Sequence, residues 1–423
     1  MYIHLFFFQT KRCAGGANCL RISIPGQTKK IKNRMIKPKR IYRTIIDTGS
    51  PYLVIPNNNV EISTYFSTVL EDETTNIKRN DALDNNFLFN KLLPFLEWDT
   101  YFNYVDDANV PFELDNSSFD PTEDVYGSQL GVIEWKQSQI TVRDNRILPL
   151  RAATSTSSTN DKENKSQSSI VLGVLDESLT RESGGPLLGL VKRSNMTTDK
   201  VKLRPTFFDQ VGMLPLTATT TTPANDEANE KREITSFQID SPNRQLILSA
   251  EKDASLIPND GTNVIEMVDL RPLGDFVEHY AFIVDELSLN GGEYRITPKN
   301  LSSKTQNPRR PIIAVFDTGL TGCLFTQPLW DALQNYGIPN PADLVSVEVC
   351  KSAGRDNKHH ISIQSDATKN PFFYLAPIEL DWFDDEENAP YVIVLGQTFL
   401  SRGALTIDIE NRRATFELPA DKS

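Results

Sequence analysis

Two aspartates, Asp47 and Asp317, each begin an Asp-Thr-Gly triplet, and each triplet ends an apolar run. Residues 44–46 precede the first triplet and residues 312–316 precede the second, and further apolar residues follow both. This pattern predicts a buried strand that delivers one carboxyl group at its end and then turns sharply, which glycine permits because it has no Cβ. A single Asp of this kind is more often a turn residue that caps nearby N–H groups. Two copies with matching flanks favour a shared chemical role.

A pair of carboxyl groups in one site can hydrolyse an amide. If two similar halves pack around an approximate twofold axis, the two strand ends meet and the carboxyl groups share that site. Like charges so close together cannot both ionise cheaply, so the pair holds one proton over a wide pH range. One Asp then acts as a base toward a bound water, and its partner acts as an acid toward the carbonyl under attack. This chemistry uses neither a metal nor a covalent intermediate.

At these residues the sequence resembles the pepsin-like aspartic peptidases, the two-lobed eukaryotic type. Further segments match that family in order and spacing, and together they cover most of the chain from about residue 20 to residue 418. They are residues 125–133, similar to the flap hairpin; residues 171–174 and 185–190, similar to the strand beneath the first catalytic loop; residues 392–400, its counterpart in the second half; and residues 404–416, similar to the last hairpin.

The resemblance implies an all-β fold: a bilobal, pepsin-like double barrel with pseudo-twofold symmetry and a few short helices. It divides the chain into an N-terminal basic and apolar segment (1–19), an N-terminal lobe with the first catalytic Asp, the flap and inserts (20–263), and a C-terminal lobe with the second catalytic Asp (264–423). The length of 423 residues fits two lobes, each able to bury its own core.

The resemblance also implies an activity, that of an aspartic-type endopeptidase acting in proteolysis. Asp47 and Asp317 are the expected catalytic residues. The residues expected to support them are Thr48, Gly49, Ser50, Thr318 and Gly319, with the two threonines bracing the loops against each other. The residues expected in the flap, facing the substrate, are Tyr126, Gly127 and Ser128. For Tyr126 a second interpretation stays open, that of an ordinary packed strand aromatic.

Two positions depart from the family pattern. Leu320 follows the second triplet, where relatives usually have a hydroxyl residue that donates to the catalytic carboxylate, whereas Ser50 fills that place after the first. Since losing a donor destabilises a charged carboxylate, we predict a working pH displaced upward from that of an acid-adapted relative. Val54 stands where many relatives have a tryptophan that hydrogen-bonds the flap tyrosine. These departures favour the alternative function, a catalytically impaired binding or inhibitor protein on the same scaffold.

Composition and charge limit the kinds of molecule that the chain is expected to bind. With 39% hydrophobic and 24% charged residues, the chain has the composition of a soluble globular protein. No apolar run approaches the length that spans a bilayer, and the formal charge of −12 argues against nucleic acid as a partner. The resemblance implies a peptide or protein substrate and no cofactor or metal. It also implies a monomer, because one chain carries both triplets, whereas retroviral-type peptidases supply one per chain and dimerise.

The compartment stays open at this stage. Relatives are mostly secreted or vacuolar, which favours secretion or the endomembrane system here. Residues 1–8 are apolar but too short, and lack the leading positive charge, for a clear signal peptide. Four sequons permit glycosylation, at Asn116, Asn164, Asn195 and Asn300. Cys13 and Cys19 can close a small loop and Cys323 and Cys350 can form a second bridge, but four cysteines do not fix the pairing.

Charge is unevenly placed near the N-terminus. Residues 1–46 contain eleven Lys or Arg and no Asp or Glu. The densest run, residues 29–40, lies between residues 20–24 and 41–45, which resemble the paired strands that open the family's first lobe. We interpret the run as a solvated hairpin extension. The alternative, an inhibitory arm like that of family zymogens, fits poorly with a position inside the lobe.

Between residues 56 and 126 the chain is longer than the family needs, acidic, and rich in aromatic residues. We expect either a lobe decoration that packs its aromatics inward or an acidic rim that favours basic peptides. Residues 151–169 and 216–231 are Ser/Thr-rich and are expected to be disordered surface loops. Residues 234–248 predict a hairpin, and residues 329–333 have helical spacing.

Overall fold

The structure is a computed structural model. Among the residues that it describes, strands dominate and helices are few and short, so the predicted all-β class is confirmed. The described strands form sheets of twelve, eleven, four and two strands. The structure describes residues 5–9, 11–12, 18–25, 29–31, 34–36, 39–56, 105–106, 114–117, 119–126, 129–138, 140–142, 146–147, 170–175, 187–192, 204–210, 233–250, 256–257, 263–275, 277–301, 310–353, 359–370, 372–380, 383 and 389–419.

The elements up to residue 249 are called the first half below. They are β1 (Leu5–Gln9), β2 (Lys11–Arg12), β3 (Asn18–Pro25), β4 (Lys29–Ile31), β5 (Arg34–Ile36), β6 (Lys39–Asp47), β7 (Leu53–Pro56), β8 (Val105–Asp106), β9 (Asp115–Asn116), β10 (Thr122–Tyr126), β11 (Gln129–Ser138), β12 (Thr141–Val142), β13 (Arg146–Ile147), β14 (Ile170–Leu175), β15 (Leu187–Gly189), α3 (Phe207–Gln210), β16 (Ser236–Asp240) and β17 (Gln245–Ser249).

The elements from residue 265 onward are called the second half. They are β18 (Ile265–Val268), η5 (Arg271–Leu273), β19 (Ala281–Val284), β20 (Glu286–Leu289), η6 (Asn290–Gly292), β21 (Tyr294–Ile296), α4 (Pro298–Leu301), β22 (Ile312–Phe316), β23 (Cys323–Thr326), α5 (Gln327–Tyr336), η7 (Pro341–Asp343), β24 (Ser346–Ala353), β25 (His359–Asp366), β26 (Leu375–Ile378), β27 (Tyr391–Leu395), α6 (Gln397–Leu400), β28 (Ala404–Asp408) and β29 (Arg413–Glu417).

The two halves repeat one strand arrangement. In the first half five neighbouring strands run in the order β14-β7-β15-β6-β3, and in the second half the order is β26-β23-β27-β22-β19. The sense of each pairing also repeats: β15 is parallel to β6 and antiparallel to β7, and β27 is parallel to β22 and antiparallel to β23. Since the five strands follow the same chain order in both halves, the fold contains an internal duplication.

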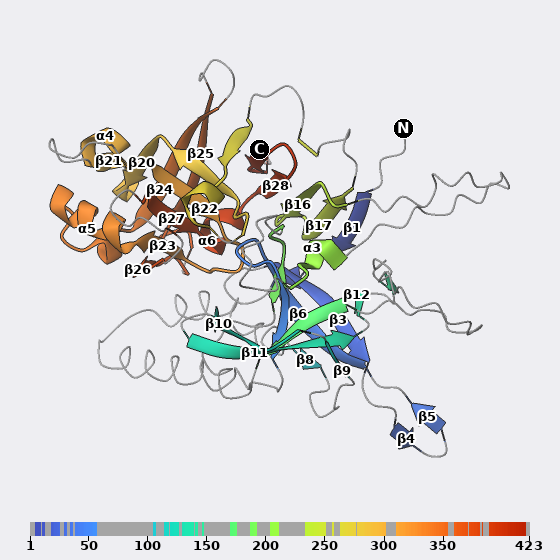
Figure 1. The fold of residues 1–423 in the computed structure, drawn as a ribbon. Coiled ribbons are helices and arrows are strands. Elements are labelled where there is room, and N and C mark those ends of the chain that lie inside the picture. Colours follow the sequence, from blue (N-terminus) through green and yellow to red (C-terminus); the bar gives the residue numbers. More distant parts are fainter. Residues whose placement is uncertain are drawn as a thin grey trace, which may run out of the picture.

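A shared sheet joins the halves. β16 of the first half pairs antiparallel with β28 of the second, and β17 and β1 extend the same sheet outward. In Figure 1 this region lies at the upper right, between the orange and red second half and the blue and green strands β3, β6 and β11 below. The N-terminal strand β1 is therefore paired at this sheet edge, far along the chain from its partner.

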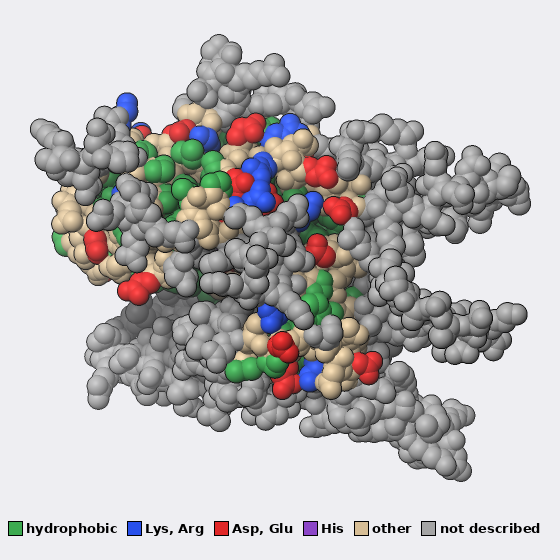
Figure 2. All heavy atoms as spheres, viewed as in Figure 1, with side chains coloured by type: hydrophobic (Ala, Val, Ile, Leu, Met, Phe, Trp, Pro, Cys, Tyr) green, Lys and Arg blue, Asp and Glu red, His purple; other side chains and the backbone are tan. Residues whose placement is uncertain are grey.

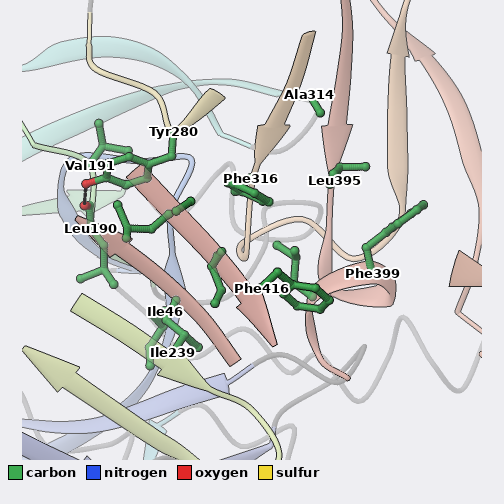
Figure 3. Close-up of a cluster of buried hydrophobic side chains, with 14 of the residues drawn as sticks. Ile46, Leu190, Val191, Ile239, Tyr280, Ala314, Phe316, Leu395, Phe399 and Phe416 are labelled. Atoms are coloured by element: carbon green, nitrogen blue, oxygen red, sulfur yellow. Dashed lines mark hydrogen bonds between the residues drawn. The ribbon is translucent and has the colours of Figure 1, made fainter. Parts of the chain in front are cut away.

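The core crosses from one half to the other. Figure 3 shows Ile46 and Leu190 of the first half in one buried cluster with Phe316 and Leu395 of the second. The hydroxyl of Tyr280 lies within this cluster and donates a hydrogen bond of 2.6 Å to the Leu190 carbonyl. The strand ends that carry the two triplets therefore pack in the same hydrophobic core.

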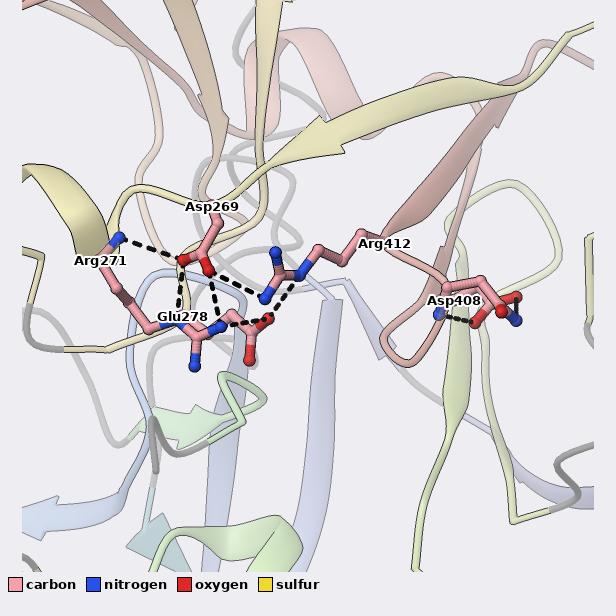
Figure 4. A network of polar contacts seen from close by, with 6 residues as sticks. Asp269, Arg271, Glu278, Asp408 and Arg412 are labelled. Atoms are coloured by element: carbon pink, nitrogen blue, oxygen red, sulfur yellow. Dashed lines mark hydrogen bonds and ion pairs between the residues drawn. The ribbon is translucent and has the colours of Figure 1, made fainter. Parts of the chain in front are cut away.

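Charged side chains hold the chain where the second half begins. Figure 4 shows Asp269 between two guanidinium groups, those of Arg271 at 2.7 Å and Arg412 at 2.9 Å, with Glu278 accepting from Arg412 at 3.2 Å. The hydrogen bond from Arg271 lowers the pKa of Asp269. The network ties the segment between β18 and β19 to the β28–β29 turn. On the face shown in Figure 2, acidic and basic side chains lie intermixed.

Several local predictions are confirmed. β4 and β5 pair as a hairpin within the basic run, and β3 pairs with β6 on either side of it. β16 and β17 form the hairpin predicted for residues 234–248, and α5 covers the predicted helix at residues 329–333. Gly337 ends α5 with φ 114°, a conformation that favours glycine.

The cysteines differ from one expectation. Cys323 and Cys350 are free thiols, so the second bridge does not form, while Cys19 belongs to a disulfide. Cys323 lies on β23 and Cys350 on β24, in different sheets. Cys13, residues 151–169 and 216–231, and most of the acidic insert lie outside the described residues. Among the helices in the described ranges, none has the length and apolar character needed to cross a bilayer.

Candidate active site

The two aspartates stand at equivalent points of the duplicated arrangement. Asp47 is the last residue of β6, and Asp317 directly follows β22. All five residues of β22 are buried, which suits a strand that has a parallel neighbour and is covered on both faces. Both loops are also equal in length, because β7 begins six residues after Asp47 and β23 begins six residues after Asp317.

Two threonines join the loops in a reciprocal set of hydrogen bonds. The hydroxyl of Thr48 donates to the Phe316 carbonyl at 2.8 Å and accepts from the Thr318 amide at 3.0 Å. The hydroxyl of Thr318 donates to the Ile46 carbonyl at 2.7 Å and accepts from the Thr48 amide at 3.1 Å. Both threonines are buried, so these four bonds fix the loops against each other without competition from water.

The glycines of the triplets let the carboxyl groups meet. A Cβ built on Gly49 would lie 2.7 Å from Cγ of Asp317, and one built on Gly319 would lie 2.5 Å from Cγ of Asp47. Each glycine therefore packs against the carboxyl group of the opposite loop, at a distance that no side chain permits. This packing places the two carboxyl groups next to each other, so that the charge of one acts on the other.

The two carboxyl groups sit in unequal surroundings. Asp47 is 5% exposed and accepts the Gly49 amide at 2.8 Å. Asp317 is half-buried and accepts two amides, Gly319 at 2.8 Å and Leu320 at 3.1 Å. Burial first, and the nearby charge of Asp317 second, raise the pKa of Asp47 well above its usual range. The more buried group is thus the natural holder of a shared proton.

Each loop is also held from behind by the strand that crosses beneath it. The Leu190 amide donates to the Asp47 carbonyl at 2.7 Å, and the Asp317 amide donates to the Leu395 carbonyl at 3.0 Å. Gln397 adds a side-chain contact, since its amide nitrogen donates to the Thr318 carbonyl. Sequence reasoning assigned Gln397 to the matching strand segment and missed this role, although its position after the apolar run and Gly396 is a usable signal.

Leu320, the first of the two residues that depart from the family pattern, still contacts Asp317 through its backbone, because its amide is the second donor to that carboxylate. The second, Val54, is buried in a small cluster with Ile133, Trp135, Val171 and Leu175. Sequence reasoning did not single out Trp135, whose indole lies within this cluster beside the first loop.

The predicted flap is described at its strands. β10 and β11 pair antiparallel, and the last residue pair of this ladder joins Tyr126 to Gln129. Gly127 and Ser128, together with the side chain of Tyr126, lie outside the described residues. β11 continues into pairing with β14, which pairs with β7, and so connects the hairpin to the first loop.

No known family model and no curated protein matches this chain.

The assembled site can move protons between two carboxyl groups and a bound molecule. It offers one buried group with a raised pKa, one more exposed group with two amide donors, and a rigid frame. That combination suits general acid–base chemistry, in which one group takes a proton while its partner gives one.

Proposed function

We propose that the chain is an aspartic endopeptidase with a pepsin-like double-barrel fold. The observation that carries the proposal is the cross-bracing of Thr48 and Thr318, which brings the carboxyl groups of Asp47 and Asp317 together. The duplicated strand order supports two lobes, with residues 20–263 and 264–423 as their extents. A paired acid and base of this kind is the arrangement that hydrolyses an amide without a metal.

In the proposed reaction Asp47 begins protonated and Asp317 ionised. Asp317 takes a proton from a water molecule while the water oxygen attacks the peptide carbonyl carbon. At the same time Asp47 gives its proton to the carbonyl oxygen. The resulting tetrahedral diol collapses as one hydroxyl returns its proton to Asp47 and Asp317 passes a proton to the leaving nitrogen. The C–N bond breaks, and the pair returns to one proton.

Substrate is proposed to lie extended across the two loops and to pair through its backbone with the β10–β11 hairpin. Tyr126, Gly127 and Ser128 would contact it from that hairpin. Since both triplets stand in one chain, the proposal requires no partner subunit.

A second candidate is a binding or inhibitor protein on the same scaffold. The observation in its favour is Leu320, an apolar side chain beside Asp317 where a hydroxyl would strengthen the carboxylate. Such a protein would bind a peptide in the same place without cleaving it.

The deciding experiment is a digest of an unfolded protein from acidic to neutral pH, with and without a statine-type mimic of the tetrahedral state. We expect cleavage that the mimic blocks and that Asp47→Asn abolishes. A wild-type chain that binds the mimic but leaves the substrate intact would favour the binding protein. Cleavage that survives in Asp47→Asn would come from a contaminant and would count against the proposal.

A further inference from the structure

Trp135 is the largest side chain of the small cluster that lies between the hairpin and the first loop. Trp135 is 4% exposed, and the one polar atom of its side chain is hydrogen-bonded: Nε1–H donates to the hydroxyl of Thr122 at 2.8 Å. Thr122 is the first residue of β10. In the backbone ladder it faces Ile133, two residues before Trp135, so this hydrogen bond extends the hairpin contact beyond the paired residues.

The same indole contacts the loop that carries the first aspartate. The rings of Tyr52 and Trp135 meet edge to face, with centroids 5.0 Å apart and planes at 73°. Tyr52 lies between Asp47 and β7, and its carbonyl accepts the Gly189 amide at 2.9 Å. A movement of Trp135 would therefore displace the segment around Tyr52, which is hydrogen-bonded to Gly189 of β15.

Arg204 makes a parallel contact with the same region. Its guanidinium carbon lies 5.5 Å from the centre of the Trp135 ring, within the range of a cation–π contact. The same group donates to the Asp120 carbonyl at 2.9 Å. Trp135 and Arg204 together hold residues 120–122, where the chain enters the hairpin.

The sheet makes room for the indole. Gly173 of β14 is the cross-strand partner of Trp135. A Cβ at Gly173 would lie 2.6 Å from Cγ2 of Ile133 and 3.5 Å from Cζ3 of Trp135. A larger residue there would displace Ile133 and Trp135, so Gly173 leaves the space in which these two side chains pack.

We propose that Trp135 is a positioning residue, which ties the entry of the β10–β11 hairpin to the loop of Asp47 and so sets the position of the hairpin relative to that loop. This role rests on the proposed peptidase function. The side chain of Val54 has no polar atom that could form a hydrogen bond, whereas the indole of Trp135 contacts both Thr122 and Tyr52. A purely structural aromatic would need the ring but not the N–H donor, and this difference can be measured.

The test compares Trp135→Phe, Thr122→Val, the double variant and Thr122→Ser. Thr122→Val removes the acceptor and keeps the shape of the side chain, and Thr122→Ser keeps the acceptor. Trp135→Phe removes the donor together with part of the ring that contacts Tyr52 and Arg204. Leu333→Val, in the remote core of α5, serves as a control for general loss of stability. Two readouts are taken, amide hydrogen exchange in peptides covering residues 122–138 and kcat/KM on a cleaved peptide.

We expect Thr122→Val to speed exchange in β10 and to lower kcat/KM roughly fivefold, as for one buried hydrogen bond. Trp135→Phe should have at least this effect, because it also removes part of the ring. Most of the loss should come from a higher KM, because the hairpin contributes contacts and not the acid and base. The double variant should be no worse than Trp135→Phe alone, since the hydrogen bond is already lost in that variant. Thr122→Ser should stay close to wild type.

Unchanged exchange in both single variants would overturn the tie, whatever the kinetics. Additive losses, or an equal loss in Leu333→Val, would show general destabilisation and would also overturn it. A wild-type chain that cleaves nothing would overturn the proposed function and with it any role of Trp135 in catalysis, and this outcome is distinct because exchange still reports on the hydrogen bond.

Discussion

The loops of Asp47 and Asp317 share their frame but not their surroundings. Strand order, loop length and the bonds of the two threonines repeat from one half to the other. The carboxyl groups nevertheless differ, because Asp47 is almost fully buried and Asp317 is more open and receives an extra amide from Leu320. The duplicated fold brings the two carboxyl groups together, and in the proposed mechanism their different surroundings make Asp47 the acid and Asp317 the base.

Replacing either aspartate tests whether both loops are needed. Asp47→Asn removes the proposed acid and Asp317→Asn removes the proposed base, so each should lower kcat by about 10⁴-fold or more, at the upper end of what one acid or base contributes. The measurement is single-turnover cleavage by each purified variant.

Equal and complete losses fit a pair that acts as a unit. If one variant kept a tenth of the wild-type rate, its carboxyl group would be dispensable and the division of roles would be wrong. Far-UV circular dichroism serves as the control for folding in both variants.

The threonine brace should be symmetric in its energetics, even though the carboxyl groups are not. Thr48→Val and Thr318→Val each remove a hydroxyl that takes part in two buried hydrogen bonds and leave a carbonyl and an amide without partners. We expect each to lower the free energy of unfolding by about 2–4 kcal/mol. The measurement is urea denaturation of both variants.

Serine at each position keeps the hydroxyl and is the matched control, so it should recover most of the loss. A large effect at one threonine and none at the other would show that the brace is one-sided.

The strands that carry the two aspartates could be predicted from the sequence, but the side-chain contacts around them could not. The apolar residues before each triplet correctly placed the ends of β6 and β22. β22 is apolar throughout, as a buried strand with a parallel neighbour is, whereas β6 also contains Lys39, Arg40 and Arg43. The bond from Trp135 to Thr122 depends on sheet register and on the space left by Gly173, which no local pattern reveals. A bridge from Cys323 to Cys350 looked feasible for a similar reason, since sequence does not show that they lie in different sheets.

Stability against pH should separate the two aspartates. The pKa of Asp47 is raised in the folded protein, by burial first and by Asp317 second. The folded state then holds this proton more tightly than the unfolded chain, so its stabilising effect is complete below about pH 4 and is lost as the pH rises through the folded pKa. Asp47→Asn removes this dependence.

We therefore expect the stability of Asp47→Asn relative to wild type to increase from pH 4 to neutrality, measured by urea denaturation at each pH. Asp317→Asn removes only the second cause, so it should flatten the curve less. Parallel curves for wild type and Asp47→Asn would mean that burial does not raise the pKa.

The smallest expected effect concerns the residue in which the loops differ most plainly, Leu320 against Ser50. A hydroxyl at position 320 would add a donor to the ionised form of the pair, and that form would then persist to lower pH. Leu320→Thr should therefore move the acid limb of the kcat/KM profile downward by roughly half a pH unit. Leu320→Val has nearly the shape of threonine without the hydroxyl, so it should leave the limb in place. If both variants and the wild type share one profile, the missing hydroxyl does not set the working pH, and the unequal burial of the two aspartates would be left as the difference between the loops that matters.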